Sequence, residues 1–136
     1  MLTLLEKVNL LQKAPVFQGV HTESLARVAA VAQEVSWDAQ QLLFRANEAA
    51  DTLFVLLDGE VALLRDGKET RRLGPNEAVG VLAVLAGDSH TESAKATRAV
   101  HALRIDQQDF YDVMAEDFNV TRGVLKALVR LAAGGG

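Results

Sequence analysis

The side chains with the greatest capacity for chemistry in this sequence are three histidines, His21, His90 and His101. They are scattered, and no His-x-His or His-Glu-x-x-His spacing brings two of them together as metal ligands. We therefore interpret each as a surface or loop histidine. The absence of cysteine excludes disulfides, thiolate zinc sites and cysteine nucleophiles.

Serine nucleophiles and glycine-rich phosphate loops are two further features that carry catalysis in other proteins. The sequence has four serines, Ser24, Ser36, Ser89 and Ser93. None of them lies in the context of a nucleophile elbow. Residues 80–87 begin and end with glycine, but their spacing matches neither type of glycine-rich phosphate loop. The sequence therefore predicts a chain that is not an enzyme.

The composition is typical of one soluble domain. The 136 residues, 49% apolar and 24% charged, suffice for one hydrophobic core and are close to the globular average. No apolar run approaches the roughly 18–20 residues that a membrane helix needs. An early acidic residue, Glu6, and the lack of a basic n-region argue against a secretory signal. We expect a single cytoplasmic domain over residues 1–136, with no membrane segment.

The charge distribution argues against a nucleic-acid partner. The formal net charge is −4, whereas nucleic-acid binding relies on clustered lysine and arginine. The basic residues are dispersed, and the one basic pair, Arg71-Arg72, lies close to Glu69. The sequence predicts no nucleic-acid binding by this chain itself.

Helices are expected over residues 3–33. Thr3 and Glu6 form a capping-box pattern, in which each side chain accepts from a free backbone N–H group. Pro15 ends the first helix at or before Ala14, because the residue before a proline disfavours the helical conformation. A second helix is expected to start at His21-Thr22. Its buried face comprises Leu25, Val28, Ala29 and Ala32.

Short strands are expected over residues 35–105. Apolar runs at 53–57 and 61–64 are each followed by Asp-Gly, at Asp58-Gly59 and Asp66-Gly67. Asp-Gly between apolar runs indicates a tight hairpin, because both central residues of a type I′ turn need positive φ. A turn at residues 74–76 and further strands at about 93–97 and 101–105 bring the total to about eight. The pattern predicts an eight-stranded antiparallel β-roll, or jelly roll, with two helices at each end.

The C-terminal helices are expected over residues 107–133. Asp106 is the predicted cap of the first, and the last is expected from about Val120. One apolar face of that helix is predicted to comprise Val124, Leu125, Leu128 and Leu131. Another face carries a basic stripe of Arg122, Lys126 and Arg130. This stripe is either a solvated helix side near a C-terminus, where the helix dipole favours cations, or a docking surface.

Three stretches of this chain resemble the cyclic nucleotide-binding domain family. Residues 15–20, Pro-Val-Phe-Gln-Gly-Val, are followed by a helix, by Leu43-Phe44 and by a strand closed with Asp-Gly-Glu-Val at 58–61. Residues 73–80, Leu-Gly-Pro-Asn-Glu-Ala-Val-Gly, resemble the approach to the family's phosphate-binding cassette. Residues 105–111 resemble its exit into the C-terminal helices. The resemblance covers nearly the whole chain and implies a β-roll that senses cAMP or cGMP.

The resemblance places the ligand site in the cassette, which in the family reads roughly Gly-Glu-x-Ala-Leu-Leu, a loop, then Arg-Ser/Thr-Ala. It implies that the arginine pairs with the cyclic phosphate and that the glutamate accepts from the ribose 2′-hydroxyl; a guanidinium fork suits phosphate oxygens. Here Val81 occupies the glutamate position and His90 the arginine position. In a shifted alignment Glu92 occupies the arginine position, so neither register supplies the arginine. The corresponding site residues are Gly80, Val81, Leu82, Ala83, His90, Thr91 and Glu92.

These two replacements predict weak binding. Removing one member of a buried charge pair typically costs about 2–5 kcal/mol, and an unpaired ribose hydroxyl costs roughly 1–3 kcal/mol more. At about 1.4 kcal/mol per decade, the loss is on the order of 10²–10⁵ in affinity. Lys95 and Arg98 are the substitutes considered for the arginine, although solvated hairpin charges are the simpler interpretation.

The resulting hypothesis is a degenerate bacterial member of the family. It would bind cAMP or cGMP weakly or not at all, hold no other cofactor or metal, and serve a partner-binding or structural role in a larger signalling or transport protein. The partner would be a domain of the parent protein or a second copy, docked through the C-terminal helix. The alternative is a functional cAMP or cGMP sensor. A transcription factor is not expected, because the DNA-binding members carry a helix-turn-helix after the last helix.

Overall fold

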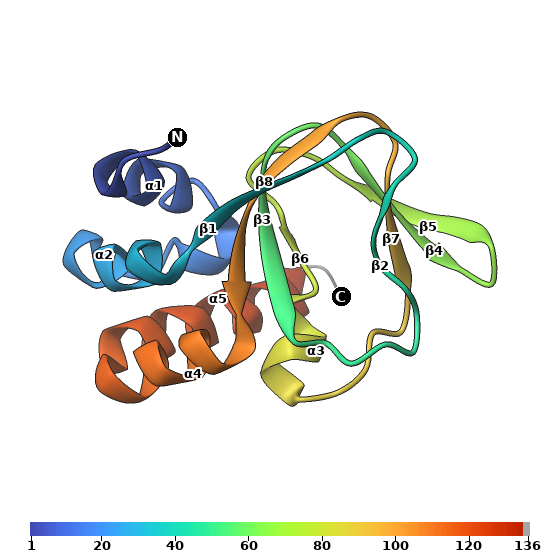
Figure 1. The fold of residues 1–136 in the computed structure, drawn as a ribbon. Helices are drawn as coiled ribbons and strands as arrows, with labels where there is room; N and C mark the ends of the chain where they lie inside the picture. The colour runs from blue at the N-terminus through green and yellow to red at the C-terminus, as the bar shows by residue number, and fades with distance from the viewer. Residues whose placement is uncertain (135–136) are drawn as a thin grey trace.

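The structure, a computed structural model, describes residues 1–134. Helices lie on one side of a strand assembly and wrap its lower edge (Figure 1). In chain order the elements are α1 (Leu4–Leu11), η1 (Pro15–Phe17), α2 (Thr22–Val31), β1 (Gln33–Trp37), β2 (Leu42–Phe44), β3 (Thr52–Asp58), β4 (Val61–Arg65), β5 (Lys68–Leu73), β6 (Ala78–Val79), α3 (Val81–Ala86), β7 (Ser93–Ala96), β8 (Val100–Asp106), α4 (Gln107–Glu116) and α5 (Phe118–Gly134).

The strands form two four-stranded antiparallel sheets, ordered β1-β8-β3-β6 and β2-β7-β4-β5. This confirms the predicted eight-stranded antiparallel roll with flanking helices. The structure adds two helical elements to the four predicted, the short η1 and the α3 helix inside the cassette.

One of the two predicted hairpins is wrong. Asp66 and Gly67 both have positive φ, 54° and 78°, and β4 pairs with β5 as expected. At Asp58-Gly59 only the glycine has positive φ, 94°, and β3 and β4 lie in different sheets. A Cβ on Gly59 would lie 2.2 Å from the carbonyl oxygen of Ala99. The glycine is therefore needed where the chain crosses between the sheets and passes close to the opposing backbone.

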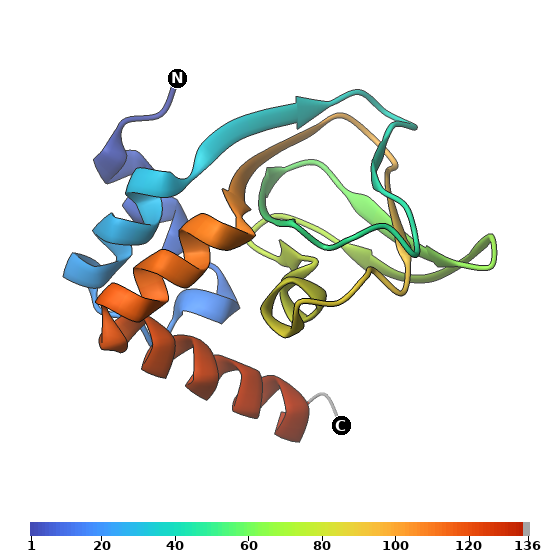
Figure 2. The same cartoon turned by 60° about the horizontal axis from the view of Figure 1, so that its bottom comes forward.

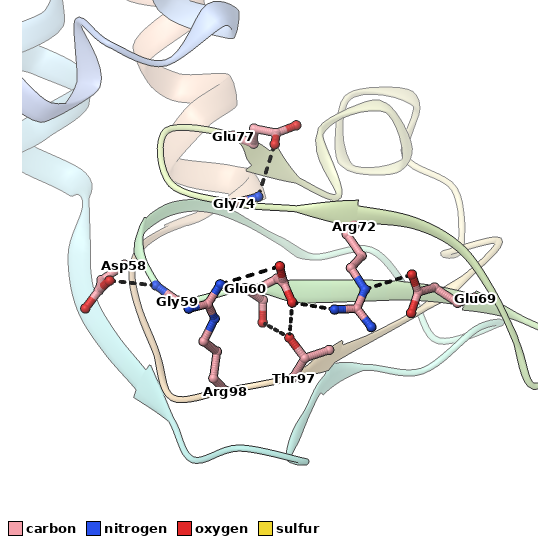
Figure 3. A network of polar contacts seen from close by, with 9 residues as sticks. All are labelled: Asp58, Gly59, Glu60, Glu69, Arg72, Gly74, Glu77, Thr97 and Arg98. Atoms are coloured by element: carbon pink, nitrogen blue, oxygen red, sulfur yellow. Dashed lines mark hydrogen bonds and ion pairs between the residues drawn. The ribbon is translucent and has the colours of Figure 1, made fainter.

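Polar side chains hold this crossing together, as Figure 3 shows. The Glu60 carboxylate accepts from Thr97 and from Arg72, each at 2.7 Å, and lies 3.6 Å from an Arg98 nitrogen. The hydrogen bond from Thr97, followed by the charges of Arg72 and Arg98, lowers the pKa of Glu60 against an opposing effect of desolvation. Glu60 thus joins the start of β4 to β5 and to the segment between β7 and β8.

Two hydrophobic cores lie on opposite faces of the β1-β8-β3-β6 sheet. β8 sends Leu103 and Ile105 toward the helices, and Val100 and Ala102 into the roll. Under the helices Phe17 and Phe110 meet edge to face, with centroids 6.0 Å apart. Inside the roll Trp37 and Phe54 do the same at 5.0 Å. Because side chains alternate between the two faces of a strand, β8 contributes residues to both cores.

The N-terminal cap predicted for α1 is present, whereas the cap predicted for α4 is not. The capping box of Thr3 and Glu6 is present, and the predicted buried face of α2 is buried. Asp106 occupies the N-cap position of α4 but makes no side-chain cap. Its carboxylate instead accepts from Thr52 at 3.2 Å and from Arg104 at 2.7 Å. These partners on the same face of the sheet compete for the group that would have capped the helix.

The last helix begins at Phe118, and its predicted apolar face needs correction. Val124 is buried and Leu128 partly buried, but Leu125 and Leu131 are more than half exposed. Adjacent helical residues point about 100° apart, and here Val124 points into the core whereas Leu125 points to solvent. α5 packs through Gly123, which lies against the backbone of Gly19 after η1. Figure 2 shows α5 running beneath the other helices toward α3.

Candidate functional site

The cassette connects β6 to β7 and is built around Gly80. This residue has φ 85° and precedes α3, whose first residue, Val81, is buried. A Cβ on Gly80 would lie 3.1 Å from Cε1 of His90. The glycine therefore provides the turn into α3 and also leaves room for the imidazole ring beside it.

A cavity of about 330 Å³ lies against the cassette. All seven site residues named from the sequence line it, namely Gly80, Val81, Leu82, Ala83, His90, Thr91 and Glu92. The roll contributes Phe44, Leu63, Arg71, Leu73, Glu77 and Ala78, and the helical side contributes Pro15, Val16, Leu128 and Leu131. Residues far apart in the chain thus surround one mainly apolar space.

Arg71 and Glu77 are lining residues that the sequence reasoning missed. Arg71 lies two residues before Leu73 on β5, and Leu73 is buried in the roll. Side chains two apart on a strand share a face, so the inward position of Leu73 also places Arg71 on the cavity side. Strand alternation around Leu73 was the signal that could have identified this arginine.

His90 closes one end of the cavity in an uncharged form. Its side chain is buried and its ring stacks on Phe44, with centroids 3.5 Å apart and planes 8° from parallel. Burial lowers the pKa of His90, and the nearby carboxylates of Asp51 and Glu48 offset this only in part. Since the ordinary histidine pKa is about 6.5, the ring is mostly neutral near pH 7.

The charged side chains that line the cavity carry both signs of charge. Arg71 is the lining arginine, and its guanidinium lies 3.3 Å from the Glu77 carboxylate. A second carboxylate, Glu92, accepts a hydrogen bond from the Thr70 hydroxyl. Neither Lys95 nor Arg98 is among the residues that line the cavity. One cation therefore faces two carboxylates and a neutral imidazole.

Arg104 faces a different space, on the far side of the Phe44–His90 stack. It lines a separate cavity of about 630 Å³, to which Phe44 and His90 also contribute. Its Nη2 donates to Asp106 at 2.7 Å, and its buried Nε has no partner among the described residues. Phe44 and His90 thus line both cavities.

α4 holds the end of the cassette helix. The Tyr111 hydroxyl donates to the carbonyl oxygens of Val84 and Leu85, at 3.0 and 3.1 Å, and Gln107 Nε2 donates to that of Val84 at 2.7 Å. The last carbonyl groups of a helix lack the regular intrahelical partners. The side chains of α4 supply partners here, in addition to the bond that Val84 accepts from the Gly87 N–H at 3.2 Å. A displacement of α3 would break these contacts with α4.

An antiparallel β-roll with a short helix in its cassette and a terminal helix beside the same cavity defines a class of regulatory β-roll domains. The family model of the cyclic nucleotide-binding domain matches residues 34–117, more than half of the chain. The chain belongs to the cyclic nucleotide-binding domain family.

Similar proteins have different overall lengths. The CRP-like cAMP-activated global transcriptional regulator of Mycobacterium tuberculosis is 26% identical over 127 residues, covering 90% of this chain and 57% of that protein. An NTE family protein of the same organism is 26% identical over 122 residues, covering 89% of this chain and 21% of that protein. The N-terminal domain of a Streptomyces coelicolor transcriptional regulator superposes with a TM-score of 0.80 at 26% identity, covering 93% of this chain and 94% of that one. The chain spans about half of the length of the mycobacterial regulator and about a fifth of the length of the NTE family protein.

None of the helices over residues 1–134 is both long and apolar enough to cross a bilayer. Within the same range no three His, Asp or Glu side chains are grouped as ligands of a metal ion.

Proposed function

We propose that this chain is a regulatory domain whose cassette has lost the glutamate and the arginine that the family uses for its ligand. It binds cAMP and cGMP weakly or not at all and catalyses no reaction. Its role is structural or partner-binding, in the cytoplasmic part of a larger signalling or transport protein. Its site residues are the seven cassette residues that line the cavity.

The observation that carries this proposal is the chemistry at the two replaced positions. Val81 is a buried apolar residue where the family places the ribose acceptor. His90 is buried, stacked on Phe44 and held neutral by burial where the family places the phosphate partner. A cyclic phosphate bound here would meet the Glu92 carboxylate, while the Arg71 guanidinium that lines the cavity is paired with Glu77.

The size of the expected loss follows from these substitutions. A missing charge-pair partner costs about 2–5 kcal/mol, and an unsatisfied ribose hydroxyl about 1–3 kcal/mol. The sum corresponds to a loss on the order of 10²–10⁵ in affinity. A dissociation constant of about 1 μM with an intact cassette would therefore rise to between about 100 μM and 100 mM.

Calorimetric titration of the chain with cAMP and with cGMP tests the proposal. We expect no saturation below roughly 100 μM ligand, the strong end of the affinities that remain after such losses. A dissociation constant in the micromolar range or tighter would contradict the degenerate-site hypothesis.

The second candidate function is a working cyclic nucleotide sensor, and the position of Arg71 favours it. This guanidinium lines the cavity on a largely exposed side chain and could exchange Glu77 for a phosphate. The name of the mycobacterial relative, a cAMP-activated regulator, supports the same function. Under this hypothesis Arg71→Ala abolishes binding, whereas Arg72→Ala, whose side chain pairs with Glu60 and Glu69, leaves it unchanged.

A further inference from the structure

One face of α5 is left without a partner by the fold. This docking face consists of Phe118, Arg122, Leu125, Lys126, Val129 and Arg130, which line a shallow groove of about 380 Å³. It lies opposite the side that packs through Gly123 and Val124. The apolar residues of the docking face are therefore not part of the hydrophobic core of the domain.

The apolar residues of the docking face are unusually exposed for their size. The exposed fractions of Phe118, Leu125 and Val129 are 72%, 55% and 68%. Their spacing of seven and then four residues aligns them in one row along the helix. Single exposed apolar residues are ordinary, but an aligned row on one helix is typical of an interface.

A second row on the same face is cationic. Arg122, Lys126 and Arg130 follow one another at four-residue intervals and are all exposed. No carboxylate of the described residues lies within 4.0 Å of these three side chains. α5 carries none of the 18 acidic residues of the chain, although the chain as a whole is acidic. The positive charge is therefore concentrated on this helix and uncompensated there.

We propose that the docking face binds an amphipathic helix of a partner protein, with apolar residues on one side and glutamate or aspartate beside them. This inference rests on the proposed partner-binding role and names the chemistry of the partner. Adjacent apolar and cationic rows form a groove into which the ridge of another helix packs. Carboxylates on that ridge would pair with the three cations and fix the register of the two helices.

A second copy of the chain matches this face less well. A symmetric dimer brings the same patch of both copies together. Two docking faces would then gather six cations, three from each copy, and no carboxylate in one interface. An acidic helix supplies the missing charges and buries the same apolar row.

The probe for this proposal is a synthetic helical peptide of about 28 residues with leucine at heptad positions a and d and glutamate at e and g. Binding to the whole chain is followed by fluorescence anisotropy at several salt concentrations. We expect saturable binding that weakens with salt, and no comparable binding of a peptide with lysine at e and g. Arg122→Glu with Lys126→Glu and Arg130→Glu should weaken binding roughly tenfold or more.

The matched control reverses three exposed cations outside α5, by Lys13→Glu, Arg65→Glu and Lys68→Glu, and should bind the glutamate peptide like the parent chain. Equal binding of the peptide to both triple variants, or of the lysine peptide to the parent chain, would overturn the proposal. Two other results would also overturn it. One is that the parent chain dimerises with increasing concentration and the α5 variant does not. The other is that the parent chain binds phosphatidylserine vesicles but not the peptide, and that the α5 variant no longer binds the vesicles. A cAMP titration of the same samples tests the degenerate cassette separately, so that failure of one idea is distinguished from failure of the other.

Discussion

Replacement of Gly123 by alanine tests how closely α5 is held against the loop between η1 and α2. Two effects of opposite sign are expected. Alanine is a better helix former than glycine, which alone would stabilise the domain by roughly 0.5–1 kcal/mol. The new Cβ, however, would lie 2.5 Å from Cγ2 of Val20 and 2.8 Å from the carbonyl carbon and oxygen of Gly19. A methyl group can rotate away, but the Gly19 backbone can yield only if the helix moves.

The steric effect should prevail. Overpacking of a well-packed contact typically costs about 1–3 kcal/mol, and two backbone atoms at 2.8 Å place Gly123→Ala near the upper end of that range. After subtraction of the gain in helix propensity, the net destabilisation is about 2 kcal/mol. For a chain of this length the melting temperature should then fall by about 3–10 °C.

Circular dichroism melts of the two matched glycine variants provide the assay. Gly74→Ala is the control, because its Cβ would meet no atom within 4 Å and its φ is not positive. It should leave the melting temperature almost unchanged. An unchanged or raised melting temperature of Gly123→Ala would show that helix propensity prevails and that α5 does not pack closely on Gly19, which would refute the reasoning.

Three further predictions concern the cassette and the sheet crossing. The triple variant Val81→Glu, His90→Arg, Glu92→Ala should bind cAMP and melt at a higher temperature in millimolar cAMP. At a hundredfold excess of ligand over Kd, binding adds about 2.7 kcal/mol to the free energy of unfolding. A folded variant without a thermal shift would contradict the assignment of these positions. Burial lowers the pKa of His90, so its stabilising contribution is complete above about pH 6.5 and decreases as the pH falls through the folded-state pKa. His90→Phe should therefore reduce the loss of stability on acidification in denaturant titrations, and an unaltered pH dependence would argue against a neutral His90. Gly59→Ala should destabilise the domain by about 3 kcal/mol or more, because its Cβ would lie 2.2 Å from the Ala99 carbonyl oxygen; a native melting temperature would exclude that close approach.

The sequence predicted the elements of the roll better than their pairing. Asp66-Gly67 and Asp58-Gly59 are identical dipeptides that each come after an apolar run, yet only the first forms a hairpin. The difference arises from the approach of Ala99 to Gly59, a contact between residues 40 positions apart. A local pattern identifies a tight bend, but a distant backbone decides whether the chain stays in one sheet or crosses to the other.

The candidate site shows the same limit. The cassette residues were found because they are contiguous in the sequence and resemble a family motif. Phe44, the stacking partner of His90, lies on β2, and Arg71 lies on β5, so both meet the cassette only in three dimensions. The sequence pattern predicts Leu125 on the packed face of α5, but α5 carries apolar residues on two of its sides, one buried and one exposed. Gly123 marks the packed side, which an apolar periodicity alone does not reveal.

The strand order also has a consequence for biosynthesis. β8 lies between β1 and β3, so the strand that joins these two is synthesised after both of them. The same holds for β7, which lies between β2 and β4. Because such pairings close long loops, they form slowly compared with local helices. While the chain emerges from the ribosome, α1, α2 and the β4–β5 hairpin can therefore form first. β1 and β2 have no strand partner, and β3 and β4 each keep one edge unpaired, until residues 93–106 have been made.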